Sequence, residues 1–193
     1  MPHSAEHRAL RELHVFGRQL TSHWERLGRR LGGPEAGLLA AGAADARALL
    51  TEAGALMAAR DVPADRAAGF AGRIVSARPS SPDELLERNQ ALRYALLDVQ
   101  HVITLLGYAA ALAAARGDEE LRALCAAGEE RLARHERPLR DAIVTLGTRP
   151  DEAIGPAVPS AAGRVGQRVA AGAGAFGEWV DRRAIARRGD APG

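Results

Sequence analysis

The chain has 193 residues, of which 47% are hydrophobic and 4% aromatic, and its formal net charge is +2. This length provides for one domain with a sizeable core, and the Ala- and Leu-rich composition favours packed helices over sheets. All 26 basic residues are Arg. A sequence without Lys cannot form a lysine Schiff base or supply a P-loop lysine. The single Cys125 likewise excludes an intramolecular disulfide and a four-cysteine metal site.

The N-terminal sequence MPHSAEHRALREL is charged and amphipathic, unlike a signal peptide. The most apolar stretch of the chain, residues 96–117, is interrupted by Asp98, Gln100 and His101. A membrane-spanning helix needs about 20 predominantly apolar residues, so we predict no transmembrane segment. We therefore expect a cytoplasmic protein.

The first two helices are predicted over about residues 4–31 and 35–60, because apolar residues recur there every three or four positions. The Gly32-Gly33-Pro34 sequence separates them, and Pro34 fits the first position of the second helix. The apolar stripe of the first helix comprises Leu10, Leu13, Gly17, Leu20, Trp24, Leu27 and Leu31. That of the second comprises Leu39, Gly42, Ala46, Leu49, Leu50, Ala53 and Met57.

A shorter helix is expected around 64–77, within the crossover to the third long helix. The sequence SSPDELLERN predicts the start of that third helix, with Ser81 as N-cap, Pro82 at the first position and Glu84 completing a capping box. We expect it to run to about Arg116. Asp118 is the predicted cap of the fourth helix, which covers about 118–147 and ends at Gly147.

These elements predict an all-α protein: an up-and-down four-helix bundle with a short crossover helix and an extra C-terminal helix. The predicted bundle domain covers 1–148, and a Pro-containing connection covers 149–159. An amphipathic, Gly- and Arg-rich helix is expected over 160–188, before a flexible tail at 189–193.

The third helix is predicted to be apolar on two sides. Its main stripe comprises Leu85, Leu92, Leu96, Val99, Ile103 and Leu106. Asp98 and His101 lie nearly opposite, beside further apolar residues. A helix that is apolar on two sides is usually buried on two sides, so the second side needs a partner: the C-terminal helix or another subunit. The candidate interface residues are Tyr94, Leu97, Leu105, Tyr108, Phe176 and Trp179.

Four residues are candidate metal ligands: Asp98, His101, His135 and Glu136. Asp98 and His101 are three residues apart, which places both on one side of a helix. A di-iron bundle of the ferritin-like type needs Glu from two helices and Glu-x-x-His from each of the other two, and this set is incomplete here. A divalent metal is thus the one candidate cofactor, and the missing ligands argue against it.

Alternative interpretations apply to the remaining histidines. His135 shares the apolar side of the fourth helix and precedes Pro138, so it is either part of a pocket or a core histidine bonded to a carbonyl or a carboxylate. His14 and His23 are predicted to be surface residues. Cys125 lies on the apolar side of the same helix and is expected in the core.

The sequence favours a non-enzymatic bundle that acts by self-association or by binding a protein partner. The alternative is a ferritin-like bundle that binds a metal or a small ligand, with oxidoreductase activity as one form of it. The GAGAFG sequence, 172–177, matches a dinucleotide fingerprint but leaves no room for the second strand which that fold requires. Basic residues in 160–188 allow a membrane-surface role. No basic stripe with interleaved aromatics indicates nucleic acid.

Overall fold

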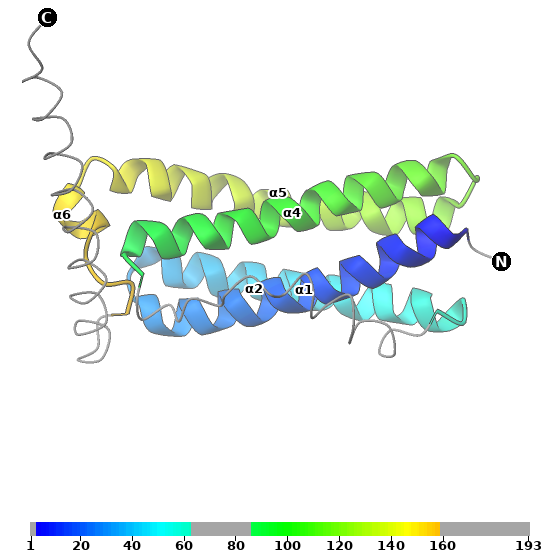
Figure 1. Cartoon of the computed structure of the whole chain (residues 1–193), viewed down its shortest axis with the longest axis horizontal. Coiled ribbons are helices and arrows are strands. Elements are labelled where there is room, and N and C mark those ends of the chain that lie inside the picture. Colours follow the sequence, from blue (N-terminus) through cyan, green and yellow to red (C-terminus); the bar gives the residue numbers. More distant parts are fainter. Residues whose placement is uncertain (1–2, 63–85, 159–193) are drawn as a thin grey trace, which may run out of the picture.

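The computed structural model describes residues 3–62 and 86–158. It confirms the predicted all-α fold, because four long helices pack against one another along their lengths (Figure 1). The helices are α1 (Ser4–Leu31), α2 (Pro34–Ala59), α4 (Arg88–Ala114) and α5 (Glu119–Leu146). A short helix, α6 (Pro150–Ala153), follows within the connection predicted after the bundle.

The bundle consists of two hairpins, α1–α2 and α4–α5. Helix α1 packs against α4 and α2 packs against α5, so the four helices form a square in section. Neighbouring helices run antiparallel, as in an up-and-down bundle, while α2 and α4 lie on a diagonal and run in the same direction (Figure 1). The crossover predicted between α2 and α4 therefore joins opposite ends of the bundle.

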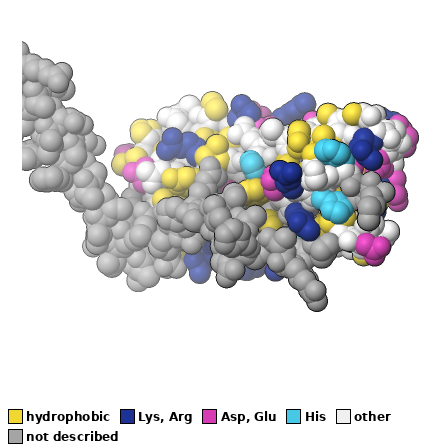
Figure 2. Space-filling view, turned by 45° about the vertical axis from the view of Figure 1, so that its right-hand side comes forward, with side chains coloured by type: hydrophobic (Ala, Val, Ile, Leu, Met, Phe, Trp, Pro, Cys, Tyr) yellow, Lys and Arg dark blue, Asp and Glu magenta, His cyan; other side chains and the backbone are white. Residues whose placement is uncertain are grey.

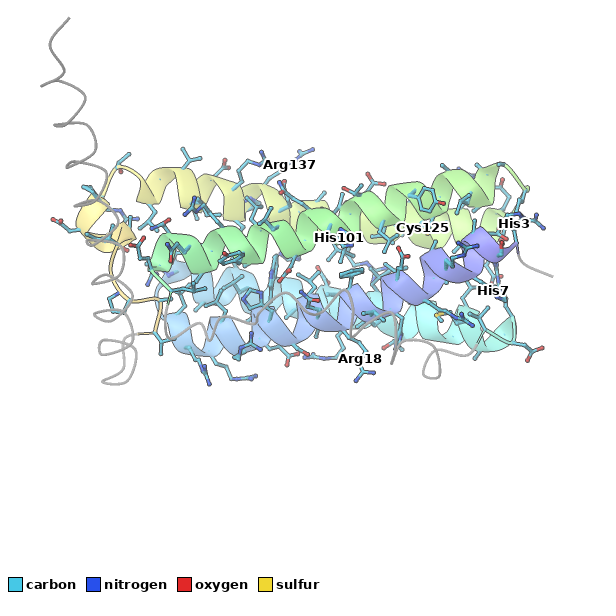
Figure 3. All side chains as sticks on the ribbon, viewed as in Figure 1. His3, His7, Arg18, His101, Cys125 and Arg137 are labelled. Atoms are coloured by element: carbon cyan, nitrogen blue, oxygen red, sulfur yellow. The ribbon has the colours of Figure 1, made fainter. Side chains whose placement is uncertain are left out.

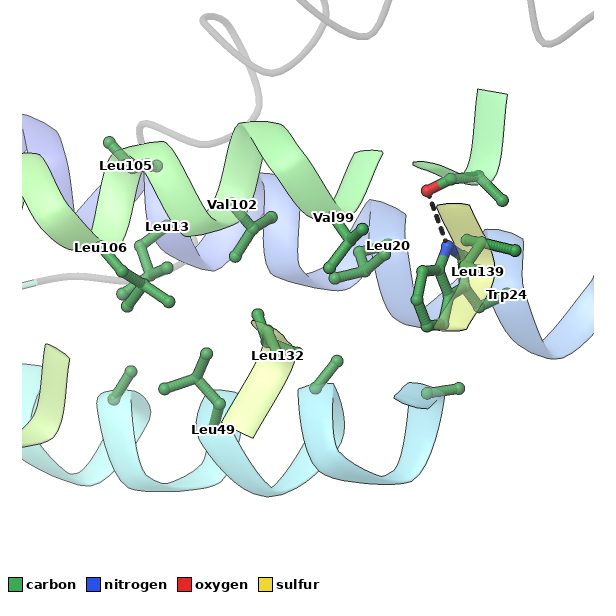
Figure 4. Packing of buried hydrophobic residues seen from close by; sticks show 14 of the residues in the cluster. Leu13, Leu20, Trp24, Leu49, Val99, Val102, Leu105, Leu106, Leu132 and Leu139 are labelled. Carbon is green, nitrogen blue, oxygen red and sulfur yellow. Dashed lines mark hydrogen bonds between the residues drawn. The ribbon is translucent and has the colours of Figure 1, made fainter. Parts of the chain in front are cut away.

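The core lies between the two hairpins and confirms the predicted apolar stripe of α1. All seven residues of that stripe are buried, and Trp24 is the largest side chain with no exposed surface. The indole Nε1–H of Trp24 donates to the carbonyl oxygen of Ala95 in α4, at 3.0 Å (Figure 4). A buried indole N–H without an acceptor would be costly, so this bond fixes where α1 meets α4.

Each end of the bundle is tied by an arginine from one hairpin to the loop of the other. Arg88, at the start of α4, donates to the carbonyl oxygens of Leu31 and Gly32 and pairs with Glu35 at 2.7 Å. It thereby satisfies carbonyls left unpaired at the end of α1.

At the opposite end, Arg60 donates to both carboxylate oxygens of Asp118 and to Glu120. Asp118 is the N-cap of α5, as predicted, and accepts from the amide of Leu121 at 3.1 Å. One carboxylate therefore caps α5 and holds the end of α2.

The start of α4 differs from the sequence prediction. The helix begins at Arg88, with Glu87 as N-cap and a capping box formed with Gln90. Leu86 and Glu87 are not helical: the carbonyl of Leu86 accepts a backbone bond from the amide of Ala157, and Glu87 has extended backbone angles and forms a bridge with Pro156. The predicted cap at Ser81 lies outside the described residues, as do the predicted helices at 64–77 and 160–188.

Helix α4 has the length and composition of a membrane span, with a mean hydropathy of 1.5 over its most apolar window, one third of which is buried. The prediction from Asp98, Gln100 and His101 was that no segment would qualify. The core helix of a bundle meets the same criteria, and α4 contributes Leu92, Val99 and Leu106 to the core.

Gly42 is predicted to be essential for packing around Trp24. A Cβ atom at position 42 would lie 2.1 Å from Cζ3 of the indole, so Gly42→Ala should lower the free energy of unfolding by about 1–3 kcal/mol. Gly54→Ala in the same helix is the control, because a Cβ there meets nothing within 4 Å. It should be neutral or stabilise by about 0.5–1 kcal/mol. Urea unfolding measures both, and equal effects would contradict the packing argument.

Asp118→Asn is predicted to destabilise the fold only above acidic pH. The hydrogen bond from Arg60 lowers the pKa of Asp118 from 3.8, against the effect of burial. A carboxyl with a lowered folded pKa stabilises the fold above its unfolded pKa and loses this contribution as the pH falls through the folded value. Asn keeps the cap. The variant should lose about 0.5–1 kcal/mol at pH 7. Urea unfolding at acidic pH should show a smaller deficit, and an undiminished one would contradict the prediction.

Candidate functional site

Two histidine–carboxylate pairs join the hairpins near the middle of the bundle. His23 Nδ1 of α1 lies 2.5 Å from Asp98 Oδ2 of α4, and His135 Nε2 of α5 lies 2.6 Å from Asp45 Oδ2 of α2. The prediction that His23 is a surface residue is wrong, since only 12% of its side chain is exposed. The interpretation of His135 as a core histidine bonded to a carboxylate is confirmed.

Trp24 lies between the two pairs. It follows His23 in the chain, while its ring packs against Gly42 in α2. A Cβ on Gly42 would also lie 3.3 Å from Cγ of His135. The His135–Asp45 pair therefore lies close to Gly42, as the indole does. The indole therefore fills the space where residues from all four helices approach one another. This packing separates the two histidine–carboxylate pairs.

Glu136 forms a third polar contact beside this layer. Its Oε1 accepts from Gln100 Nε2 of α4 at 3.0 Å, and it also pairs with Arg140 one turn further along α5. Burial raises the pKa of Glu136, but the bonds from Arg140 and Gln100 outweigh it, and the pKa is lowered. Glu136 is therefore a charged partner of α4 and not a proton donor at neutral pH.

His101 is an exposed residue of α4 (Figure 3). Its ring meets that of Phe16 of α1 edge to face, with the ring centroids 4.1 Å apart. The pair borders an open groove of about 420 Å³ between α1 and α4. The groove is lined by Phe16, Gln19, Leu97, Asp98, Gln100, His101 and Thr104. It is mixed in character, because carboxylate and amide groups lie beside two rings and a leucine.

The four predicted metal ligands do not converge. Asp98 contacts His23, His135 contacts Asp45, Glu136 contacts Gln100, and His101 packs on Phe16. Within residues 3–62 and 86–158, no group of three or more His, Cys, Asp or Glu side chains is placed to hold a metal ion. Sequence reasoning missed the partner His23. The sequence feature that points to His23 is its spacing of four residues from Gln19, which places both side chains on one side of α1. Both side chains bond to Asp98.

The predicted interface residues of α4 fall into two groups. Tyr94, Leu97 and Tyr108 are 45%, 43% and 52% exposed. Leu105 is a correction, because it is 7% exposed and packs in the core of its own bundle. Phe176 and Trp179 lie outside the described residues. Figure 2 shows hydrophobic side chains dispersed among Arg and His on the described part of one side of the molecule.

Cys125 is buried, as predicted, and burial raises the pKa of its thiol to about 11. A thiol that remains protonated at neutral pH is a poor nucleophile. Cys125 therefore packs as an apolar side chain in the core of the bundle.

Cys125 should resist thiol reagents in the folded protein. At pH 8, a pKa near 11 leaves about 0.1% of the thiol ionised, and burial restricts access further. Reaction with a chromogenic disulfide should be at least about 100-fold slower in buffer than in urea. Comparable rates in the two solutions would show that the thiol is accessible in the native state.

Comparison of the chain with family models, with curated proteins and with solved structures gives no match.

Proposed function

We propose that this protein is a non-enzymatic helical bundle that acts by self-association through the outward face of α4. We define this face as Tyr94, Leu97, His101, Thr104 and Tyr108. The observation that carries the proposal is the half-exposure of Tyr94, Leu97 and Tyr108 along one side of one helix. Aromatic residues are enriched at protein interfaces, where large rings bury much area.

The spacing on this face suits a two-fold interface. His101 is seven residues from Tyr94 and seven from Tyr108, so the three recur at the heptad interval that keeps side chains in line along two packed helices. Two antiparallel copies of α4 with the axis at His101 bring Tyr94 of each copy against Tyr108 of the other. Such a contact uses the same surface twice and closes as a dimer.

The face also fits an apolar contact by its composition. None of its five residues is Asp, Glu, Lys or Arg, and depletion of charge is the signature of an interface core. Charged residues lie beside it, with exposed Arg93 on one flank and Arg137 of α5 among the exposed positions of the next helix. This arrangement provides a polar rim around an apolar centre.

The proposal predicts a concentration-dependent dimer. Single charge substitutions on the face should weaken this dimer, and a pair of opposite charges should restore it. Tyr94→Glu and Tyr108→Arg should each raise the dissociation constant at least about tenfold, because each buries a charge against a tyrosine. In the antiparallel dimer, the double variant Tyr94→Glu/Tyr108→Arg places Glu opposite Arg at both ends. It should dimerise more tightly than either single variant. Analytical ultracentrifugation measures all four proteins.

Val144→Glu is the matched control, since Val144 is 69% exposed on α5 and lies outside the proposed face. It should dimerise like the wild type. A wild-type chain that remains monomeric up to about 100 µM would overturn the proposal. A double variant weaker than both single variants would overturn the antiparallel arrangement.

A further inference from the structure

We infer that the groove between α1 and α4 binds a small primary amine that carries an aryl group. This binding is separate from the proposed self-association and does not depend on it. Three features of the groove indicate the ligand: a buried carboxylate, an amide oxygen with no hydrogen-bond donor among the described residues, and two rings beside a leucine.

The groove has the size of a small-molecule site. Its volume of about 420 Å³ lies within the range of about 300–1,000 Å³ that is usual for pockets that bind organic ligands. Its walls come from α1 and α4, which belong to different hairpins. Because the groove is open, a ligand can enter it while the four helices stay packed.

Asp98 brings a carboxylate into the groove, although only 9% of the residue is exposed. Its Oδ2 lies 2.5 Å from His23 Nδ1, and its Oδ1 accepts from Gln19 Nε2 at 3.4 Å. A carboxylate has about four lone-pair sites, so it can also accept from a ligand. Burial strengthens its attraction for a cation, because the effective dielectric constant is lower than in water.

The charges around the groove also favour a cation. The residues that line it in the described part of the chain include no Arg, and the sequence has no Lys. A ligand ammonium group therefore meets a carboxylate and no opposing guanidinium among these residues.

Gln19 provides a hydrogen-bond acceptor beside that carboxylate. Its Nε2 donates to Asp98, and its Oε1 is buried with no hydrogen-bond partner among the described residues. Both atoms belong to one amide group, so Oε1 lies near the carboxylate. Buried polar groups are nearly always paired, and an ammonium group in the groove would supply a donor to this oxygen. A primary ammonium has three N–H donors and can bond to both residues at once.

The apolar part of the groove indicates what else the ligand carries. Phe16 and His101 meet edge to face with their ring centroids 4.1 Å apart, and Leu97 lines the same groove while 43% exposed. A ligand ring can pack against this pair in the offset or edge-to-face arrangement that aromatic groups prefer. It would also remove apolar surface of Leu97 from water, which is favourable.

NMR titration of the isotope-labelled full chain with 2-phenylethylamine tests the binding. We expect saturable binding with a dissociation constant of about 1 mM or lower, as is usual for a ligand of this size. The alcohol 2-phenylethanol has no charge and should bind at least about tenfold more weakly. No saturable binding of the amine up to about 10 mM, or equal binding of the alcohol, would overturn the inference.

Two matched variants test the place of binding. Asp98→Asn should weaken the binding of the amine at least about tenfold, because it removes the charge that attracts the ammonium group. Asp45→Asn removes the same charge from the other histidine–carboxylate pair, and Asp45 is not among the residues that line the groove. It should bind the amine like the wild type. Equal weakening in the two variants would overturn the site.

Thr104→Trp decides the matter if Asp98→Asn fails to fold. Thr104 is exposed and lines the groove, so a large side chain there should block the ligand while both histidine–carboxylate pairs stay intact. Unchanged binding to the folded Thr104→Trp variant would overturn the site.

The groove shares Leu97, His101 and Thr104 with the outward face of α4. The titrations are therefore made at a chain concentration at which ultracentrifugation finds only the monomer. A chain that binds the amine and never dimerises keeps the site and overturns only the self-association. A chain that dimerises and does not bind the amine has the opposite consequence.

Discussion

The contact between Trp24 and Gly42 is the constraint on which the bundle depends. The indole of Trp24 is fully buried in the core, and it fits only because α2 presents a residue without a side chain at that level. Its single polar atom is satisfied by the backbone of α4. The contact thus fixes both the distance of α2 from α1 and the register of α4 relative to α1. The histidine–carboxylate pairs form between helices whose positions this packing has set.

The two histidine–carboxylate pairs follow from that register. Each joins one hairpin to the other, and each has its histidine on α1 or α5 and its aspartate on the neighbouring α4 or α2. Buried or half-buried polar groups need partners, so the pairs restrict how the hairpins can slide against each other. In this bundle the indole occupies the central space between the pairs. The histidines and aspartates consequently act as specific contacts between helices. The predicted metal ligands do not come together at one place.

The fold could be predicted to within a few residues where the signal was local. The stripe of α1, the position of Pro34 at the start of α2 and the cap at Asp118 depend on neighbouring residues, and all are confirmed. The start of α4 was misplaced because the backbone hydrogen bond between Leu86 and Ala157 joins residues 71 positions apart. The burial of His23 and Leu105 was missed for a related reason. Both lie at the margin of an apolar stripe, and only the neighbouring helix decides whether a marginal position is covered.

The outward face of α4 is the side of that helix that does not pack in the core of the bundle. The area of this face limits how strongly a partner can bind to it. Stable complexes bury about 800 Å² on each partner, and three half-exposed side chains on one helix supply only part of that area. A second copy must therefore bind from dilute solution with little contact area. The proposed dimer is therefore expected to be weak and to depend strongly on concentration, as small interfaces between proteins generally are.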